Sequence, residues 1–283
     1  MEKTYPVASF IITTTGQETE TGQPIAMHDS SAKQQLTGRT ILVTGAGDGI
    51  GRAVSLALAS QGATLVLLGR TLSKLEAVYD RIEEAGGAQP AIYPLNMDGA
   101  TEHDYLEMAD KLQTEFGSLE GLLHNAAQLR LLSRIDDYDS QAWYQVLQTN
   151  LNAPFMLTQA CLPLLRKAKD ASLLFTSDHV GRRAKAYWGA YAVSKFGIEG
   201  LMQVMAEELG ESSNIRVNSF APGPTRTKLR AIAYPGEDPN TLKPPEQLTP
   251  FYLWLLGPDS VGTSGMSLHE SSEIFRRAGI SRE

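Results

Sequence analysis

The sequence contains little cysteine and shows no pattern of metal ligands. Its 283 residues include one cysteine, Cys161, and five histidines, none of which pair at the spacing of zinc ligands. A single thiol excludes an internal disulfide and is typical of a reducing compartment, so we expect a cytoplasmic protein. Because Cys161 lies in an apolar run, we interpret it as a buried packing residue, and we predict no metal site.

The chain also lacks long hydrophobic runs and an excess of positive charge. No stretch approaches the ~20 apolar residues that a membrane span needs, and the N-terminus is too weakly apolar and charged for a secretory signal. The formal net charge of −7 argues against a nucleic-acid partner, which usually needs a basic face. We therefore expect neither a membrane nor a nucleic acid as partner. Hydrophobic residues, 42% of the chain, suffice for a substantial core.

The two ends of the chain differ from its middle. Residues 1–35 contain little core material, and we interpret them as a mobile arm. Met27 stands shortly before the region that looks like a domain, so the arm is either a dispensable tail or the result of a start site assigned too early. We expect one domain over residues 36–270 and a polar, exposed C-terminal tail over residues 271–283.

From Arg39 onward, short β-rich runs alternate with longer helical runs. Strands are predicted at 40–44, 64–68, 91–95, 121–124, 172–177, 215–220 and 264–268, and helices at 50–60, 72–85, 102–116, 141–167, 189–209 and 249–256. The Pro-rich stretch 222–250 reads as a loop or short helices over one end of the sheet. Apolar strands separated by helices are typical of a parallel sheet covered on both faces. The pattern predicts an α/β fold: one doubly wound Rossmann-type domain with about seven parallel strands.

A glycine cluster, Thr44 to Gly51, follows the first predicted strand. It matches T-G-x-x-x-G-x-G, and not the general G-x-G-x-x-G, because Ile50 occupies the last position of that fingerprint. Glycines here allow a tight turn and let the backbone approach a pyrophosphate at a helix N-terminus. The alternative is an ordinary glycine-rich turn. We predict a dinucleotide site that includes Thr44, Gly45, Asp48, Gly49, Ile50 and Gly51.

Arg70 follows the second predicted strand, at a position that distinguishes two dinucleotides. A carboxylate there would bond the ribose 2′-hydroxyl of NAD, whereas an arginine can accept the 2′-phosphate of NADP. The first acid downstream is Glu76, so NADP is favoured, with NAD as the alternative. Asp48 argues mildly against a second phosphate nearby, and Arg70 could instead be a surface residue paired with a helix acid.

Tyr191 and Lys195 lie one turn apart on the same face of a predicted helix. A nearby ammonium favours phenolate, so we expect the pKa of Tyr191 to fall toward working pH. Tyr191 would then donate a proton to a carbonyl oxygen as hydride arrives, or accept one from an alcohol. The spacing of Tyr191 and Lys195 alone is weak evidence for a catalytic pair, but the glycine loop upstream strengthens this interpretation.

With these two motifs in place, the sequence resembles the short-chain dehydrogenase/reductase family from about Leu36 to Leu268. Besides the glycine loop, the matching positions are His124-Asn125-Ala126-Ala127, Asn150, Tyr191, Lys195, Pro222-Gly223 and Thr227. Within the family the chain is most similar to the branch called YciK, through stretches such as Trp188-Gly189-Ala190-Tyr191 and Tyr252-Leu253-Trp254-Leu255.

The resemblance implies a role for each matching residue. Lys195 would bond the nicotinamide ribose, and Asn150 would hold a water in a proton relay behind it. Asn96 stands where the family has an adenine-binding aspartate, and its side-chain oxygen can still accept a hydrogen bond. The further cofactor-binding residues that the resemblance implies are Met97, Asn125, Ala126, Pro222, Gly223, Thr225 and Thr227. Dimers or tetramers, paired through the predicted helices 141–167 and 189–209, are also implied.

One position departs from the family. The family places a substrate-binding serine thirteen residues before the tyrosine, where this chain has Asp178, while Ser177 stands one residue too early. An ionised Asp178 has no proton to donate and would disfavour Tyr191 phenolate. Ser177 could take the role through a local bulge, Asp178 could donate as a protonated acid, or His179 could serve. Activity could also be weak or lost.

Three functions therefore stay open. The first is hydride transfer between NADP and a small carbonyl or alcohol substrate, with Tyr191, Lys195, Asn150, Ser177 and Asp178 as catalytic candidates. The second is a catalytically silent protein that senses the nicotinamide state, which Asp178 motivates. The third is dehydratase or epimerase chemistry, although such relatives usually add a substrate domain for which 283 residues leave little room.

Overall fold

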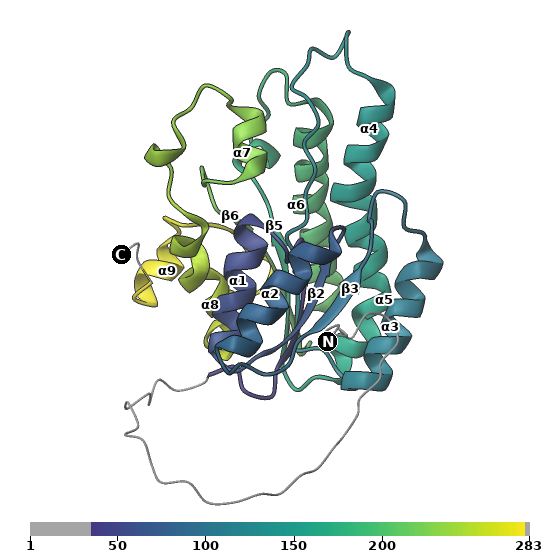
Figure 1. The fold of residues 1–283 in the computed structure, drawn as a ribbon, viewed down its shortest axis with the longest axis vertical. Coiled ribbons are helices and arrows are strands. Elements are labelled where there is room, and N and C mark those ends of the chain that lie inside the picture. The colour runs from purple at the N-terminus through teal and green to yellow at the C-terminus, as the bar shows by residue number, and fades with distance from the viewer. Residues whose placement is uncertain (1–34, 281–283) are drawn as a thin grey trace, which may run out of the picture.

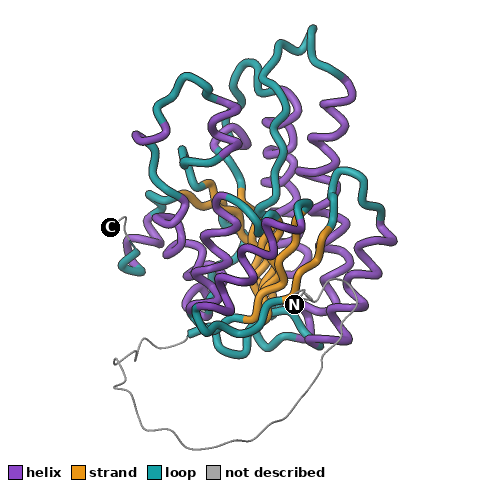
Figure 2. The backbone as a smooth tube through the Cα atoms, viewed as in Figure 1, coloured by secondary structure: helices purple, strands orange, loops and turns teal. Residues whose placement is uncertain are grey.

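The computed structural model describes residues 35–280, and residues 1–34 of the predicted arm, which include Met27, lie outside this range. In this part of the chain seven parallel strands form one sheet in the order β3-β2-β1-β4-β5-β6-β7 (Figures 1 and 2). The strands are β1 (Thr40–Thr44), β2 (Thr64–Gly69), β3 (Ala91–Pro94), β4 (Gly121–His124), β5 (Ala171–Thr176), β6 (Ile215–Ala221) and β7 (Ser267–His269). The prediction of a doubly wound α/β domain is confirmed.

Helices cover both faces of the sheet. They are α1 (Gly49–Ser60), α2 (Leu72–Glu84), α3 (Glu102–Phe116), α4 (Ser140–Leu147), α5 (Ala153–Lys167), α6 (Gly189–Leu209), α7 (Lys228–Ala233), α8 (Thr249–Leu256) and α9 (Glu273–Arg277). Helices α1, α2 and α8 lie on one face of the sheet and α3, α5 and α6 on the other (Figure 1). One buried apolar cluster joins the sheet to α3, α5 and α6, and a second joins it to α1, α2 and α8. The uninterrupted apolar strands are thus buried on both sides, as their composition predicted.

The strand order creates the place for a site. β1 pairs with β2 on one side and with β4 on the other, so the chain winds outward in opposite directions from this point. In such sheets, ligands bind in the crevice beyond the carboxyl ends of the strands at this reversal. The segment between β6 and α8 reaches over that end and contains α7 and short 3₁₀ turns (Figure 1), as the Pro-rich composition predicted.

The single helix predicted over 141–167 is divided. A π-helical turn, Gln148–Asn152, separates α4 from α5 and contains Asn150. Pro154 lies in the first turn of α5. It has no N–H, so it cannot donate to the carbonyl of Asn150 as the i+4 residue of a continuous α-helix would. Such turns inside helices are frequent at functional sites.

Over residues 271–280 the C-terminal segment is mostly exposed, but one of its side chains is buried. Phe275 of α9 is buried, with its ring centroid 4.9 Å from that of Phe251 and 5.5 Å from that of Trp254. Ile274 and Ile280 are partly buried against the same cluster, so a few apolar residues dock a mostly polar stretch, and its composition alone did not reveal this.

Candidate active site

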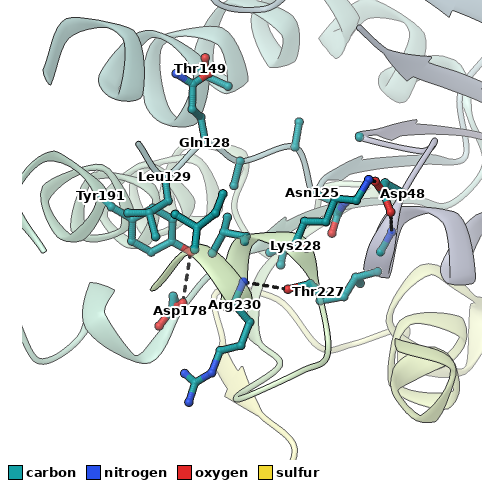
Figure 3. A pocket seen from close by; sticks show the side chains of 18 of the residues that line it. Asp48, Asn125, Gln128, Leu129, Thr149, Asp178, Tyr191, Thr227, Lys228 and Arg230 are labelled. Carbon is teal, nitrogen blue, oxygen red and sulfur yellow. Dashed lines mark hydrogen bonds and ion pairs between the residues drawn. The ribbon is translucent and has the colours of Figure 1, made fainter. Parts of the chain in front are cut away.

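A cavity of about 740 Å³ lies beyond the carboxyl ends of the strands. Most of the predicted site residues line it: Gly45, Asp48, Gly49, Ile50, Arg70, Asn96, Met97, Asn125, Ala126, Ser177, Asp178, Tyr191, Lys195, Pro222, Gly223, Thr225 and Thr227. Thr44, Gly51 and Asn150 do not line the cavity, but each contacts residues that do. Segments far apart in the sequence therefore meet at one place (Figure 3).

The glycine loop is shaped by close packing. Gly45 and Gly49 have φ of +69° and +50°, a region that L side chains rarely adopt. A Cβ on Gly51 would lie 2.2 Å from the carbonyl oxygen of Gly45 and 2.7 Å from Nδ2 of Asn125. Gly51 thus lets the first turn of α1 approach the loop, and a bulkier residue would force Gly45 or Asn125 to shift.

Thr44 ties the glycine loop to the end of β4. Its hydroxyl accepts hydrogen bonds from the backbone N–H groups of Asn125 (2.9 Å) and Ala126 (3.0 Å). In return, Nδ2 of Asn125 donates to the carbonyl of Thr44 at 3.2 Å. These bonds hold Asn125 and Ala126 at the cavity, so Thr44 has an indirect role.

Asp48 is held by two lysines. It caps α1 by accepting from the N–H of Gly49 at 2.9 Å, and its Oδ2 lies 2.5 Å from Nζ of Lys74 and 3.1 Å from Nζ of Lys228. Burial opposes ionisation, but the hydrogen bonds from Lys74, Lys228 and Gly49 outweigh it and lower the pKa of Asp48 to about 2. Because two cations compensate its charge, Asp48 does not oppose a phosphate here as strongly as the sequence suggested.

Arg70 is available for a ligand. Within residues 35–280 its guanidinium forms no hydrogen bond or ion pair, so the alternative of a surface arginine paired with a helix acid is not observed. Together with Lys74 and Lys228 it places three cations against one carboxylate, Asp48, at this end of the cavity. Lys74 and Lys228 were not predicted, because only the tertiary structure brings α2 and α7 to the glycine loop.

At the other end, Tyr191 meets Asp178. The phenol donates a hydrogen bond to Oδ2 of Asp178 at 3.1 Å (Figure 3). Oδ1 of Asp178 accepts from the N–H of Val180 at 3.1 Å, which fixes the carboxylate at the start of a 3₁₀ turn. Asp178 thus stands where the family serine was expected, and His179 makes no bond to Tyr191 among the described residues.

The Ser177 hydroxyl points away from Tyr191. It donates to Oε1 of Glu199 at 2.5 Å, on the opposite side of the chain from Asp178, as the alternation of a strand requires. Glu199 is buried on α6 and also accepts from Ser219 (2.7 Å), from Ser267 and from Nε of Arg182 (3.1 Å). These bonds form a network behind the site.

The pKa of Tyr191 is not lowered by Lys195, contrary to the prediction from the sequence. Burial, followed by the charge and hydrogen bond of Asp178, raises the pKa of Tyr191 well above its usual value, so that expectation is wrong. Burial lowers the pKa of Lys195 to about 8, against the attraction of Asp178 and Glu199. Nζ of Lys195 lies 5.6 Å from the centroid of the Tyr191 ring and donates to the carbonyl of Thr176 at 2.7 Å.

Asn150 is buried behind Tyr191 and Lys195. Its side-chain oxygen accepts from the N–H of Gln128 at 2.7 Å, and its Nδ2 donates to the carbonyl of Gln128 and to the hydroxyl of Ser194. The side chain therefore joins the π-helical turn to α6 and to the loop after β4. The water-holding role implied by the resemblance stays a prediction.

An apolar wall, which sequence analysis missed, completes the cavity. It consists of Leu129, Val180, Trp188, Leu229, Ala233 and Tyr234, brought together from four segments. The Trp188 ring centroid lies 5.5 Å from that of Tyr191 and 5.9 Å from that of Tyr234. Lys185 donates to the Tyr234 hydroxyl at 3.0 Å at the rim. No periodic pattern in the sequence marks these residues as one surface.

Three further predictions from the sequence concern metal sites, membrane spans and Cys161, and each can be compared with residues 35–280. There, no group of three or more His, Cys, Asp or Glu side chains is arranged to hold a metal, and no helix is long and apolar enough to cross a membrane. Cys161 is buried, and burial raises the pKa of its thiol to about 12. This agrees with its interpretation as a packing residue.

The chain is similar to known proteins over most of its length. A model of the family described as short chain dehydrogenase matches residues 39–237. The oxidoreductase YciK of Escherichia coli K12 is 45% identical over 256 residues, which cover 90% of this chain and 100% of that protein.

Two solved structures are similar over most of their length. A short chain dehydrogenase from Shigella flexneri 2a, complexed with NADP, has a TM-score of 0.82 at 46% identity and covers 84% of this chain and 98% of its own. A short chain dehydrogenase from Escherichia coli CFT073, complexed with NADPH, has a TM-score of 0.82 at 46% identity, with coverages of 85% and 99%. In both, a phosphorylated nicotinamide dinucleotide is the bound cofactor.

Proposed function

This chain belongs to the short-chain dehydrogenase family of oxidoreductases, and on that premise we propose that it transfers hydride between NADP and a small carbonyl compound or the corresponding alcohol. The observation that most supports this is the meeting of Tyr191 and Lys195 with the glycine loop in one cavity. When bound, the nicotinamide supplies or receives the hydride.

The residues present fit a phosphorylated dinucleotide. Gly51 lets the first turn of α1 pack closely against the loop, and the loop lies at the N-terminus of α1, where backbone N–H groups favour a pyrophosphate. Arg70 offers a guanidinium without a protein partner among the described residues, and Lys74 stands near it in the cavity lining. Since guanidinium groups bind phosphate in bidentate fashion, we propose Arg70 as the main 2′-phosphate ligand.

Further residues of the cavity would hold the rest of the cofactor. We propose that Asn96 and Met97 contact the adenine and that Asn125 and Ala126 contact the ribose beyond it. Thr225 and Thr227, with Pro222 and Gly223, follow β6 and would border the nicotinamide. Each of these residues lines the cavity, which supports the roles implied by the family.

Tyr191 would act as the proton donor in reduction. Its raised pKa keeps the phenol protonated at neutral pH, so that a proton is available to the oxygen that becomes the hydroxyl. Lys195 would bond the nicotinamide ribose and, while protonated, stabilise the phenolate left behind. Asn150 would hold a water in the proton relay behind Lys195. The bond of Ser177 to Glu199 makes Asp178 the group that faces the substrate.

The test compares wild type with Tyr191→Phe. Both proteins should bind NADPH, measured by quenching of its fluorescence, and only wild type should oxidise NADPH with members of an aldehyde, ketone and quinone panel. Equal turnover by both proteins, or failure of wild type to bind either dinucleotide, would remove the basis of the proposal.

A catalytically silent nicotinamide sensor is a second candidate, favoured by one observation. Tyr191 already donates its hydrogen to Asp178, a group that cannot hold a carbonyl oxygen while ionised. Tight NADPH binding without oxidation by any compound of the panel would favour the sensor over the enzyme.

We also propose a homodimer or homotetramer in the cytoplasm. Phe155 on α5 and Val193, Phe196 and Val204 on α6 are apolar and remain 43% to 53% exposed, on the two helices that the family pairs between subunits. The single buried thiol, Cys161, is compatible with a reducing compartment. Light scattering after size-exclusion chromatography tests the assembly, and a monomer at micromolar concentration would contradict it.

A further inference from the structure

The carboxylate of Asp178 lies beside the phenol of Tyr191, the proposed proton donor to the substrate. It is half-buried, lines the cavity and touches the phenol of Tyr191. We propose that the site also reduces C=N compounds, taken up as the protonated iminium ion, with Asp178 as the group that binds the N–H⁺. This further activity depends on the proposed hydride transfer from NADPH and concerns the substrate alone.

The hydrogen-bonding capacity of Asp178 favours a donor on the substrate. Each carboxylate oxygen accepts one protein hydrogen bond, Oδ1 from Val180 and Oδ2 from Tyr191. A carboxylate can accept about four hydrogen bonds, so roughly two acceptor positions remain for a ligand. A carbonyl oxygen has no hydrogen to offer these acceptors, and the Tyr191 phenol must first leave Asp178 before it can donate to that oxygen. An iminium nitrogen carries both a hydrogen and a positive charge, which complements the carboxylate.

Asp178 cannot easily turn away from this position. Its neighbour Ser177 is anchored on the buried Glu199, and Arg182, just after the 3₁₀ turn, is anchored on the same carboxylate at 3.1 Å. The segment that presents Asp178 is therefore held on both sides. Because the carboxylate is fixed before substrate arrives, little ordering is needed when it pairs with a cation.

The rest of the cavity suits a flat, apolar ring next to that cation. Trp188 and Tyr234 form an aromatic wall of the cavity. The ring centroid of Trp188 lies 5.5 Å from that of Tyr191 and 5.9 Å from that of Tyr234. Leu129 lines the same cavity. We therefore expect cyclic imines with an aromatic or aliphatic ring system as substrates.

The reaction balances without a proton from the protein. The hydride and its electron pair pass from NADPH to the iminium carbon and form a C–H bond. The π pair of the C=N bond becomes the lone pair of nitrogen, so the imine is reduced to a neutral amine and NADPH is oxidised to NADP⁺. The amine then takes a proton from solvent and leaves as an ammonium ion.

The experiment compares two bicyclic compounds of similar size, 3,4-dihydroisoquinoline, which has a C=N bond, and 2-tetralone, which has a C=O bond. NADPH oxidation is followed with wild type, Asp178→Asn and Asp178→Ser. We expect the ratio of kcat/KM for imine over ketone to fall roughly tenfold to a hundredfold in both variants, as the loss of an ionic hydrogen bond predicts. Asp110→Asn, an exposed acid on α3, is the control for net charge and should leave the ratio unchanged.

A binding measurement gives a readout apart from turnover. Calorimetry with NADP present should show that wild type binds protonated tetrahydroisoquinoline more tightly than 2-tetralol, and that this preference disappears in Asp178→Ser. If wild type reduces the ketone and the imine-to-ketone ratio is the same in Asp178→Ser, the inference is overturned while the proposed function stands. Absence of NADPH binding in wild type would instead overturn both.

Discussion

Arg70 offers the sharpest test of how this cavity chooses its cofactor. The guanidinium follows β2, lines the cavity and has no hydrogen-bond or ion-pair partner within residues 35–280. We predict that Arg70→Gln weakens NADPH binding and leaves NADH binding nearly unchanged. NADH lacks the 2′-phosphate, so it reports any general damage to the site.

The magnitude follows from the chemistry and the exposure of the pair. A hydrogen bond to a charged group contributes about 1.5–3 kcal/mol, and water screens an exposed pair. Because Arg70 is exposed, we expect the lower part of this range, about 1.5–2 kcal/mol, or a roughly 10- to 30-fold increase in the Kd for NADPH. Lys74 remains in the variant and retains part of the attraction for the phosphate.

The assay is fluorescence titration of each dinucleotide at fixed ionic strength. Arg81→Gln is the matched control, since Arg81 is also exposed, lies in the last turn of the adjacent helix α2 and does not line the cavity. An equal loss for NADPH and NADH, or the same loss in Arg81→Gln, would refute the assignment of the 2′-phosphate to Arg70.

Three further predictions concern Gly181, Glu199 and Lys195. Gly181→Ala should reduce turnover roughly tenfold to a hundredfold, because its Cβ would lie 2.8 Å from the backbone and Cβ of Lys195; steady-state kinetics on protein of native circular dichroism checks this, and full activity would contradict it. Glu199→Ala should lower the free energy of unfolding by about 3 kcal/mol in urea denaturation, because Arg182 and three hydroxyls lose a buried acceptor; a loss under about 1 kcal/mol would show that the network contributes little. The rate of reduction should fall as pH rises through about 8, because burial lowers the pKa of the Lys195 ammonium to that value and the protonated lysine is the active form; a pH–rate profile that stays level through this range would refute its role.

The sequence predicted the fold well because strong local patterns agreed with it. Apolar strands separated by helices left one arrangement, in which helices cover both faces of a parallel sheet. The division of 141–167 by a π-helical turn and the docking of Phe275 were not predictable, because each depends on one or two residues within a long pattern.

By itself, the sequence determined which chemical groups this protein has: the glycine loop, the tyrosine–lysine pair, an arginine after the second strand and an aspartate in place of a serine. Only the tertiary structure decided their partners, since Glu199 and Lys228 come from segments distant in sequence. Those contacts turn Ser177 away from Tyr191, direct Asp178 toward it and compensate the charge of Asp48. The physical reason is that hydrogen bonding and charge act over a few ångströms of space, whatever the distance along the chain.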